Sequence, residues 1–216
     1  MKSNSEGLMI NGIVSYIDRD NIDTDQIIPT EYLKSIKKFG YEDYLFDGWR
    51  YNDDGKLGVK KEDRDINKGF ILNNKPFTES KILLSRDNFG CGSSREHAVW
   101  ALRDFGIKAV IASSFGDIFY NNCFKNNVLP IKLDKSQIEQ IFALVKEDVV
   151  EFSIDLQKRI IYLNDNNIIN FEVEDFLIDR IIYGLDDVDI TLKERDNIAN
   201  FESNRKITKP WIYINE

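Results

Sequence analysis

The residues of this chain with the clearest capacity for chemistry stand together at Gly90–Arg95, which reads Gly-Cys-Gly-Ser-Ser-Arg. Glycine has no Cβ, so this backbone can take positive φ angles and let a ligand approach closely. Arg95 carries a planar guanidinium that can hold a carboxylate through two parallel hydrogen bonds. These residue types together indicate a site for a small organic acid or a phosphate.

The elements on either side of this loop have to position it. Ser80–Ser85 and Ile107–Ala112 are short apolar runs with the length of buried strands, and the residues between them have helical spacing. Ser93 followed by Glu96 fits a capping box, and Gly106 is a typical stop signal, so the pattern predicts a helix from Ser93. The unpaired N–H groups and the dipole of that helix start would favour an anion. A turn that only packs a helix on a sheet remains the alternative.

The run Gly90–His97, Gly-Cys-Gly-Ser-Ser-Arg-Glu-His, resembles the signature of the aconitase superfamily, in the form found in small subunits of isopropylmalate isomerases. The resemblance implies that Ser93 is the catalytic base, that Ser94 binds substrate and stabilises the transition state, and that Arg95 holds a substrate carboxylate. His97 lies a full helical turn from Ser93, and we interpret it as a packing or supporting residue rather than a general acid. The other supporting positions of the signature are Gly90, Gly92 and Glu96.

A second motif of the same family resembles Asp23–Pro29, which reads Asp-Thr-Asp-Gln-Ile-Ile-Pro. The residues alone are equally compatible with a polar turn and a short strand that Pro29 ends. The resemblance places Asp23, Thr24 and Asp25 close to the Ser-Ser-Arg loop. We expect the two aspartates to orient arginine or backbone groups rather than to act as acids or bases.

The segment Glu31–Lys38, which includes Tyr32–Ser35, has helical spacing, and by resemblance it occupies the place of the family's specificity loop. Tyr32 and Leu33 would offer an apolar wall for an isopropyl group. Relatives that act on a longer tricarboxylate carry an arginine at the position of Lys34, but a lysine can lay its stem along a pocket wall and keep its ammonium in water. Leu33 and Lys34 are therefore candidate substrate-binding residues, and 3-isopropylmalate is the expected substrate.

Two other interpretations remain open at this stage. The chain could be the small subunit of a related hydro-lyase of the citraconate, dimethylmalate or homoaconitate type. It could also be a non-catalytic module that binds an anion. The intact Ser93–Arg95 triplet favours catalysis, because a binding module would not need both serines.

Isomerising a hydroxy acid through an alkene requires a base, cationic groups for the carboxylates and an electrophile that draws off the hydroxyl. In the family the electrophile is a 4Fe-4S cluster acting as a Lewis acid. The two cysteines, Cys91 and Cys123, are too few to hold one, and the resemblance assigns neither as a ligand. We expect this chain to bind no metal or cofactor, and the cluster to belong to a large subunit that completes the site. The second substrate-binding arginine stays open among Arg19, Arg50 and Arg86.

The bulk properties limit the class of protein and of partner. A chain of 216 residues that is 42% hydrophobic can bury a full core, and we expect a single domain over 1–216 with a peripheral insertion at about 40–75. The charged run Lys60–Asp65 in that insertion is typical of a solvated surface. The net charge of −8 and the lack of a basic block argue against nucleic acid or a membrane surface as partner. Without an apolar leader or spanning run, a cytoplasmic protein is expected.

The rest of the chain alternates strand-like and helix-like patterns. Further strands are predicted over 8–17, 128–133, 149–154, 159–163 and 168–173, and helices within 113–124, 136–146 and 174–183. Short strand–helix–strand connections favour parallel neighbours. The pattern alone predicts an α/β fold with mixed strands. The resemblance spans nearly the whole chain and implies the swivelling β/β/α domain of the aconitase C-terminal domain.

Overall fold

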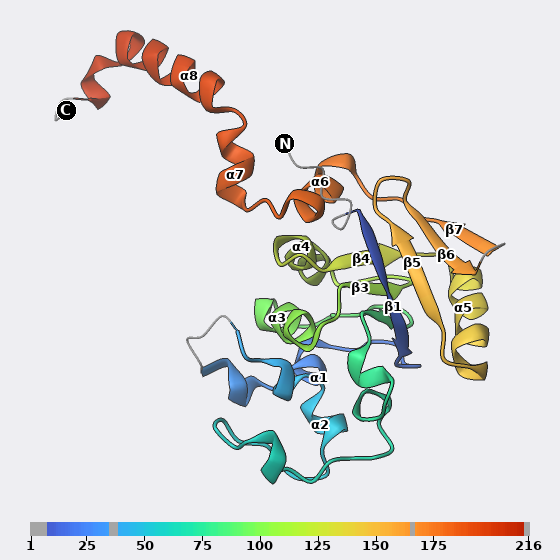
Figure 1. The fold of residues 1–216 in the computed structure, drawn as a ribbon. Helices are drawn as coiled ribbons and strands as arrows, with labels where there is room; N and C mark the ends of the chain where they lie inside the picture. The colour runs from blue at the N-terminus through green and yellow to red at the C-terminus, as the bar shows by residue number, and fades with distance from the viewer. Residues whose placement is uncertain (1–7, 35–38, 165–166, 214–216) are drawn as a thin grey trace. The chain divides into compact units, whose positions relative to one another are not determined.

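A computed structural model describes residues 8–34, 39–164 and 167–213. Its centre is a seven-stranded sheet in the order β4-β3-β2-β1-β5-β6-β7 (Figure 1). The strands are β1 Met9–Tyr16, β2 Ile82–Leu84, β3 Ala109–Ala112, β4 Leu129–Lys132, β5 Glu151–Asp155, β6 Ile160–Asn164 and β7 Asn167–Asn170. The pairs from β1 to β4 are parallel, and those from β1 through β5 to β7 are antiparallel. The predicted mixed α/β fold is confirmed.

Helices connect the parallel strands, as the strand–helix–strand pattern predicts. They are α3 Glu96–Phe105 between β2 and β3, α4 Asp117–Lys125 between β3 and β4, and α5 Lys135–Glu147 after β4. Asp134 caps α5 through a capping box with Gln137. Gly106 ends α3 at φ 111°, a conformation that glycine takes without steric cost.

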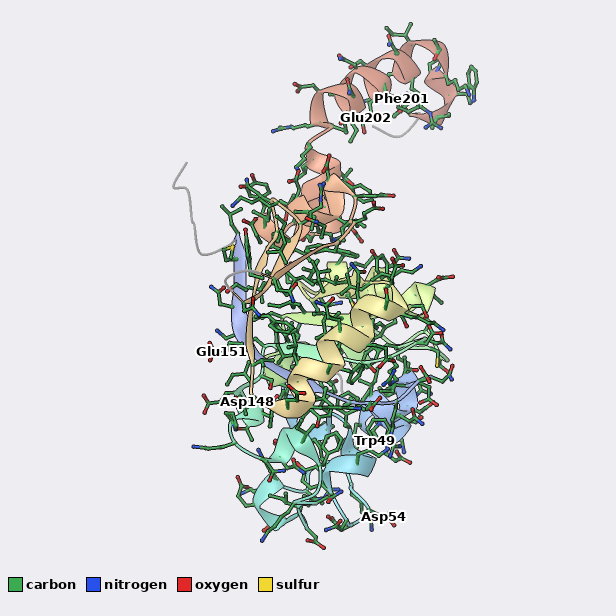
Figure 2. All side chains as sticks on the ribbon, turned by 90° about the vertical axis from the view of Figure 1, so that its right-hand side faces the viewer. Trp49, Asp54, Asp148, Glu151, Phe201 and Glu202 are labelled. Atoms are coloured by element: carbon green, nitrogen blue, oxygen red, sulfur yellow. The ribbon has the colours of Figure 1, made fainter. Side chains whose placement is uncertain are left out.

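Two hydrophobic clusters cover the two faces of the sheet, because successive side chains of a strand point to opposite faces. Ile82 and Leu84 belong to the cluster under α5 and the antiparallel strands, whereas Leu83 packs in the cluster under α3. Figure 2 shows α5 lying across its face of the sheet. The core is therefore a sheet with helices on both sides.

The segment 40–75, for which a peripheral insertion stays a prediction, contributes side chains to the core. It holds the short elements η3 Glu42–Tyr44, α2 Asp47–Arg50, η4 Lys61–Asp63 and η5 Ile71–Asn73. Tyr41, Phe46 and Leu72 are buried in the cluster under α3, so both ends of the segment complete that core. Arg64 is buried as well, although it lies in the run expected to be solvated. Its charge is paired there, which is the usual condition for burying an arginine.

The chain divides into two compact units, residues 1–183 and 184–216. The first ends with α6 Asp175–Tyr183 and contains both hydrophobic clusters. The second consists of α7 Asp187–Leu192, α8 Arg195–Thr208 and η7 Pro210–Ile212, none of which has a buried residue. The expectation of a single domain over 1–216 stays a prediction.

Among the described residues, no helix combines the length and the apolar character needed to cross a membrane.

Candidate active site

The candidate site lies where the parallel strands end. The carboxyl ends of β1, β2 and β3 meet at one edge of the sheet, and the loop after β2 carries the Ser-Ser-Arg triplet there. Gly90 N–H donates to the carbonyl of Ile22 at 2.7 Å, and Thr24 N–H donates to the carbonyl of Cys91 at 2.9 Å. Thr24 Oγ1 also donates to the Ser93 carbonyl at 3.0 Å. The two motifs, remote in sequence, are thus in direct contact.

The glycines of the loop are required by its shape. Gly90 has φ +71°, and a Cβ at this position would lie 2.2 Å from Cγ of Phe119, well inside contact distance. Gly92 has φ +88°, in the left-handed region that side chains disfavour. Both positions agree with the prediction from the sequence that these glycines are needed for the conformation of the loop.

The structure corrects the predicted helix start. α3 begins at Glu96 with Arg95 as its N-cap, and Ser93 lies in the loop before it. The predicted capping box does not form, since Ser93 is not the N-cap, and Glu96 Oε1 instead accepts a hydrogen bond from Asn126 Nδ2 at 2.9 Å. Ser93 and Ser94 are consequently exposed, with the amino end of α3 following them. Any dipole assistance to Ser93 acts from beyond the helix end, where it weakens.

Arg95 is held by the aspartate of the other motif. Its Nη1 forms an ion pair with Oδ1 of Asp25, which also accepts a hydrogen bond from Thr30 Oγ1 at 2.7 Å. The bond from Arg95, followed by that from Thr30, lowers the pKa of the Asp25 carboxyl. Arg95 is the more enclosed partner, with 17% of its side chain exposed against 51% for Asp25. Asp25 therefore has the geometry expected of a residue that orients the arginine.

Asp23 has a different task from Asp25. Its Oδ1 accepts from Gln26 N–H at 2.7 Å, and Gln26 Oε1 accepts from Asp23 N–H at 3.1 Å. This capping box starts the short helix α1, Thr24–Ile27, where the residue pattern alone was compatible with a turn and a short strand. The reason is local, because the Asp23 carboxylate accepts a hydrogen bond from the Gln26 N–H, which in a strand would donate to a neighbouring strand instead.

His97 is half-buried in an aromatic group. Its ring lies edge-on to Tyr41 at 5.4 Å and beside Trp100 at 4.5 Å between centroids. Burial lowers the pKa of His97, which favours the neutral ring. Trp100 donates to Asn126, the residue that also binds Glu96, so these side chains tie α3 to α4. The contacts of His97 are those of a packing residue.

The predicted specificity segment begins within the 3-10 helix η2, Thr30–Lys34, and its residues 35–38 lie outside the described residues. Tyr32 is 1% exposed and stacks on Tyr44 at 4.0 Å, which corrects its interpretation as part of a ligand pocket. Leu33 is half-buried and Lys34 is exposed. The two residues named as candidates thus remain the accessible ones.

The three candidate arginines differ in their environments. Arg50 is 2% exposed and donates to Asn73 and to backbone carbonyls, so it is not available to a substrate. Arg86 is paired with both Asp18 and Glu139. Arg19 is exposed, with its guanidinium carbon 4.9 Å from the centre of the Trp49 ring. Arg19 is the most accessible of the three.

The donor set does not fit an iron–sulfur cluster. Cys123 is completely buried in the core under α3, and burial raises the pKa of its thiol, so it offers no thiolate. Cys91 is partly exposed, and burial is also the main cause that raises its pKa. In the part of the chain that the structure describes, no three histidine, cysteine or acidic side chains are grouped to hold a metal ion.

A polar cluster at the start of the loop was not predicted from the sequence. The carboxylate of Asp87 accepts hydrogen bonds from Ser113 Oγ, at 3.2 Å, and from Ser114 Oγ, and pairs with Lys135 at 3.1 Å. The Ser114 hydroxyl, followed by Lys135, lowers the pKa of Asp87 to about 2. The signal was present: Asp87 and the two serines each follow a parallel strand, and such positions meet at one edge. The cluster fixes the start of the loop to the neighbouring strand ends.

Comparison with known proteins gives a consistent result. Residues 6–136 match the model of the aconitase C-terminal domain family. The chain is 47% identical over 206 residues to the 3-isopropylmalate dehydratase small subunit of Magnetococcus marinus, covering 95% of this chain and 97% of that protein. It is 44% identical to the protein of the same name from Hahella chejuensis, covering 95% and 96%. The crystal structure of 3-isopropylmalate dehydratase from Methanocaldococcus jannaschii superimposes with a TM-score of 0.61 at 31% identity, covering 90% of this chain and 99% of that one.

Proposed function

This chain belongs to the aconitase C-terminal domain family, as a small subunit of the 3-isopropylmalate dehydratase type, and we propose that it contributes Ser93, Ser94 and Arg95 to the active site of that hydro-lyase. The enzyme acts in leucine biosynthesis. The proposed reaction interconverts 2-isopropylmalate and 3-isopropylmalate by loss and re-addition of water through 2-isopropylmaleate.

The residues of this chain would take three parts in that reaction. Ser93 would remove the proton from carbon as an alkoxide, and Ser94 would donate a hydrogen bond to the substrate and the developing charge. Arg95 would hold a carboxylate. Asp25 engages Nη1 of Arg95, and the other N–H groups of the guanidinium have no hydrogen-bond partner among the described residues, so they would be left to meet a substrate.

The observation that carries this proposal is the contact between Arg95 and Asp25. It joins two motifs from distant parts of the chain and sets the guanidinium beside the exposed Ser93 and Ser94. This arrangement supports the proposal that a base and an anion-binding group act together at this edge of the sheet. A module that only bound an anion would need Arg95 but not the paired serines.

The cysteines of this chain do not fit the electrophile that the reaction requires, so we propose a partner chain that supplies it. A 4Fe-4S cluster on the large subunit would supply the Lewis acid that this chain's cysteines do not fit. The relatives are named small subunits, which implies a large one, and the serines stand exposed on a loop where a second chain can close over them. The proposal includes a cytoplasmic location, with Cys91 and Cys123 as free thiols.

Reconstitution tests the proposal directly. The purified chain is mixed with a matching large subunit loaded anaerobically with iron and sulfide, and hydration of 2-isopropylmaleate is followed by its ultraviolet absorbance. We expect activity only in the mixture, and no stoichiometric iron on this chain alone. Activity of either chain alone, or an inactive mixture, would refute the assignment. If the mixture prefers citraconate, dimethylmalate or homoaconitate, the alternative hydro-lyases are favoured.

A further inference from the structure

A buried ion pair lies within the segment 40–75, where the sequence indicated only a solvated charge run. Arg64 Nη1 contacts Asp47 Oδ1 at 2.8 Å and its Nη2 contacts Oδ2 at 3.3 Å, a two-bond arrangement. Only 3% of the Arg64 side chain and 7% of the Asp47 side chain are exposed. The remaining guanidinium nitrogen, Nε, contacts Asp53 at 2.7 Å. Each of the three guanidinium nitrogens of Arg64 thus has an oxygen partner within this segment.

The ion pair carries one further hydrogen bond, and it leads out of the segment. Tyr32 Oη donates to Asp47 Oδ1 at 3.0 Å, so the hydroxyl of η2 is held by the carboxylate that Arg64 holds. Gly55 closes the group, since a Cβ there would lie 1.7 Å from Tyr32 Oη and 2.7 Å from Arg64 Nη1. The backbone of the segment therefore approaches the three side chains as closely as packing permits.

The other end of η2 is held by the candidate active site. Thr30 Oγ1 donates to Asp25, and Asp25 pairs with Arg95. Contacts therefore run without a break from Arg95 through Asp25 and Thr30 into η2, and from Tyr32 of η2 to Asp47 and Arg64. Leu33 and Lys34 directly follow Tyr32, so the direction of their side chains depends on how Tyr32 is anchored.

Stability alone does not account for this arrangement. Burying charges costs free energy that their attraction only partly returns, and apolar residues of similar size are often as stabilising. What a two-bond ion pair with a third donor adds is direction, because its hydrogen bonds are satisfied in one geometry only. Here the fixed geometry of the ion pair determines the orientation of the Tyr32 hydroxyl.

We propose that Asp47 and Arg64 are positioning residues for substrate choice. In this proposal the ion pair fixes the hydroxyl of Tyr32, and Tyr32 in turn sets the orientation of Leu33 and Lys34 towards the substrate. The inference rests on the proposed function and deepens it. Discrimination between a branched alkyl acid and an acid with an extra carboxylate is then set partly by the segment 40–75, whose own residues need not touch the substrate.

A pair of matched substitutions tests the inference in the reconstituted enzyme. Tyr32→Phe removes the hydroxyl that Asp47 holds and keeps the ring. Tyr51→Phe is the control, because the Tyr51 hydroxyl is buried in the same segment without a hydrogen-bond partner among the described residues. We expect Tyr32→Phe to raise KM for 3-isopropylmalate roughly two- to thirtyfold with little change in kcat, and to lower its preference over cis-homoaconitate. Tyr51→Phe should leave both unchanged.

The double variant Asp47→Leu, Arg64→Met provides a second, independent test. It replaces the ion pair by apolar groups, so the chain is expected to keep its fold, checked by thermal unfolding, and to show the same loss of preference as Tyr32→Phe. The inference fails if Tyr32→Phe behaves like Tyr51→Phe, or if both substrates lose kcat equally. An inactive wild-type mixture would instead refute the proposed function, and the inference would fall with it.

Discussion

At the scale of single residues, neighbours in the triplet have opposite environments. Ser93 is exposed, and its contact with the rest of the chain is made by its carbonyl oxygen. Arg95 is largely enclosed and ion-paired. A base has to move a proton at the substrate, whereas a carboxylate-binding group has to be in place before the substrate arrives. An exposed Ser93 and an enclosed, ion-paired Arg95 are the environments that the two proposed roles require.

Ser93→Ala is the first prediction at this scale. Loss of a proton-transfer group should lower kcat of the reconstituted enzyme about a hundredfold to ten-thousandfold, with KM little changed. Arg95→Lys keeps the charge but loses the planar fork, so KM should rise as kcat falls. Steady-state kinetics on 2-isopropylmaleate measure both. A Ser93→Ala enzyme with near wild-type kcat would leave Ser93 without a catalytic role.

Substrate choice is the second prediction. Lys34 is exposed and can keep its ammonium in water, so Lys34→Ala should barely alter the preference for 3-isopropylmalate over cis-homoaconitate. Leu33→Asp should cripple isopropylmalate binding, because an unpaired charge would face the alkyl group. The ratio of kcat/KM values for the two acids measures each change. A wild-type preference for the tricarboxylate that Lys34→Ala abolishes would contradict this interpretation.

At the scale of elements, the site is made where strand ends meet. Each parallel strand delivers its next residues to the same edge, and the side chains there bind one another rather than water alone. Asp87 after β2 meets Ser113 and Ser114 after β3, and Lys135 at the start of α5. The loop that carries Ser93, Ser94 and Arg95 begins at Asp87, so its position depends on this cluster as well as on its glycines.

The third prediction concerns Asp87 and pH. Its pKa is lowered from 3.8 to about 2 in the folded chain, so the carboxylate stabilises the fold above pH 3.8, and this contribution is lost as pH falls towards about 2. Asp87→Asn should therefore lower the melting temperature near neutral pH, and the difference from wild type should shrink across that interval. Lys135→Met is the control, with a smaller effect, because the Ser114 hydroxyl is the larger cause of the shift. A difference independent of pH would exclude the carboxylate as its origin.

At the scale of the whole molecule, the two compact units differ in how they are stabilised. Residues 1–183 contain both hydrophobic clusters. The second unit exposes large apolar side chains, among them Val188, Leu192, Phe201, Ile207 and Trp211. Its helices are short, and short helices without tertiary packing are marginal in water. The stability of the fold is therefore expected to come from the first unit.

Truncation after Tyr183 tests this expectation. The shortened chain should unfold cooperatively within about 3 °C of the full chain, because the removed helices bury no residue. Circular dichroism during heating measures the transition. A much lower melting temperature would mean that residues 184–216 pack on the first unit.

The sequence by itself determined the order of the strands β1 to β7 and of the helices α3 to α6. Apolar runs and helical spacing are local properties of the chain, and they correctly indicated β1, β2, β3, α5 and the end of α3 at Gly106. The positive φ angles of Gly90 and Gly92 are likewise encoded by residue type. These features required no knowledge of distant contacts.

The tertiary structure alone decided which partner each polar side chain takes. Glu96 binds Asn126 instead of capping the helix at Ser93, and Asp25 pairs with Arg95. Arg64, which lies in the charged run, pairs with Asp47, and Asp47 also accepts a hydrogen bond from Tyr32. Hydrogen bonds and ion pairs form between groups that folding brings within about 3 Å, and spacing along the chain does not encode that distance. The contact between Tyr32 and Asp47 therefore became visible only in three dimensions.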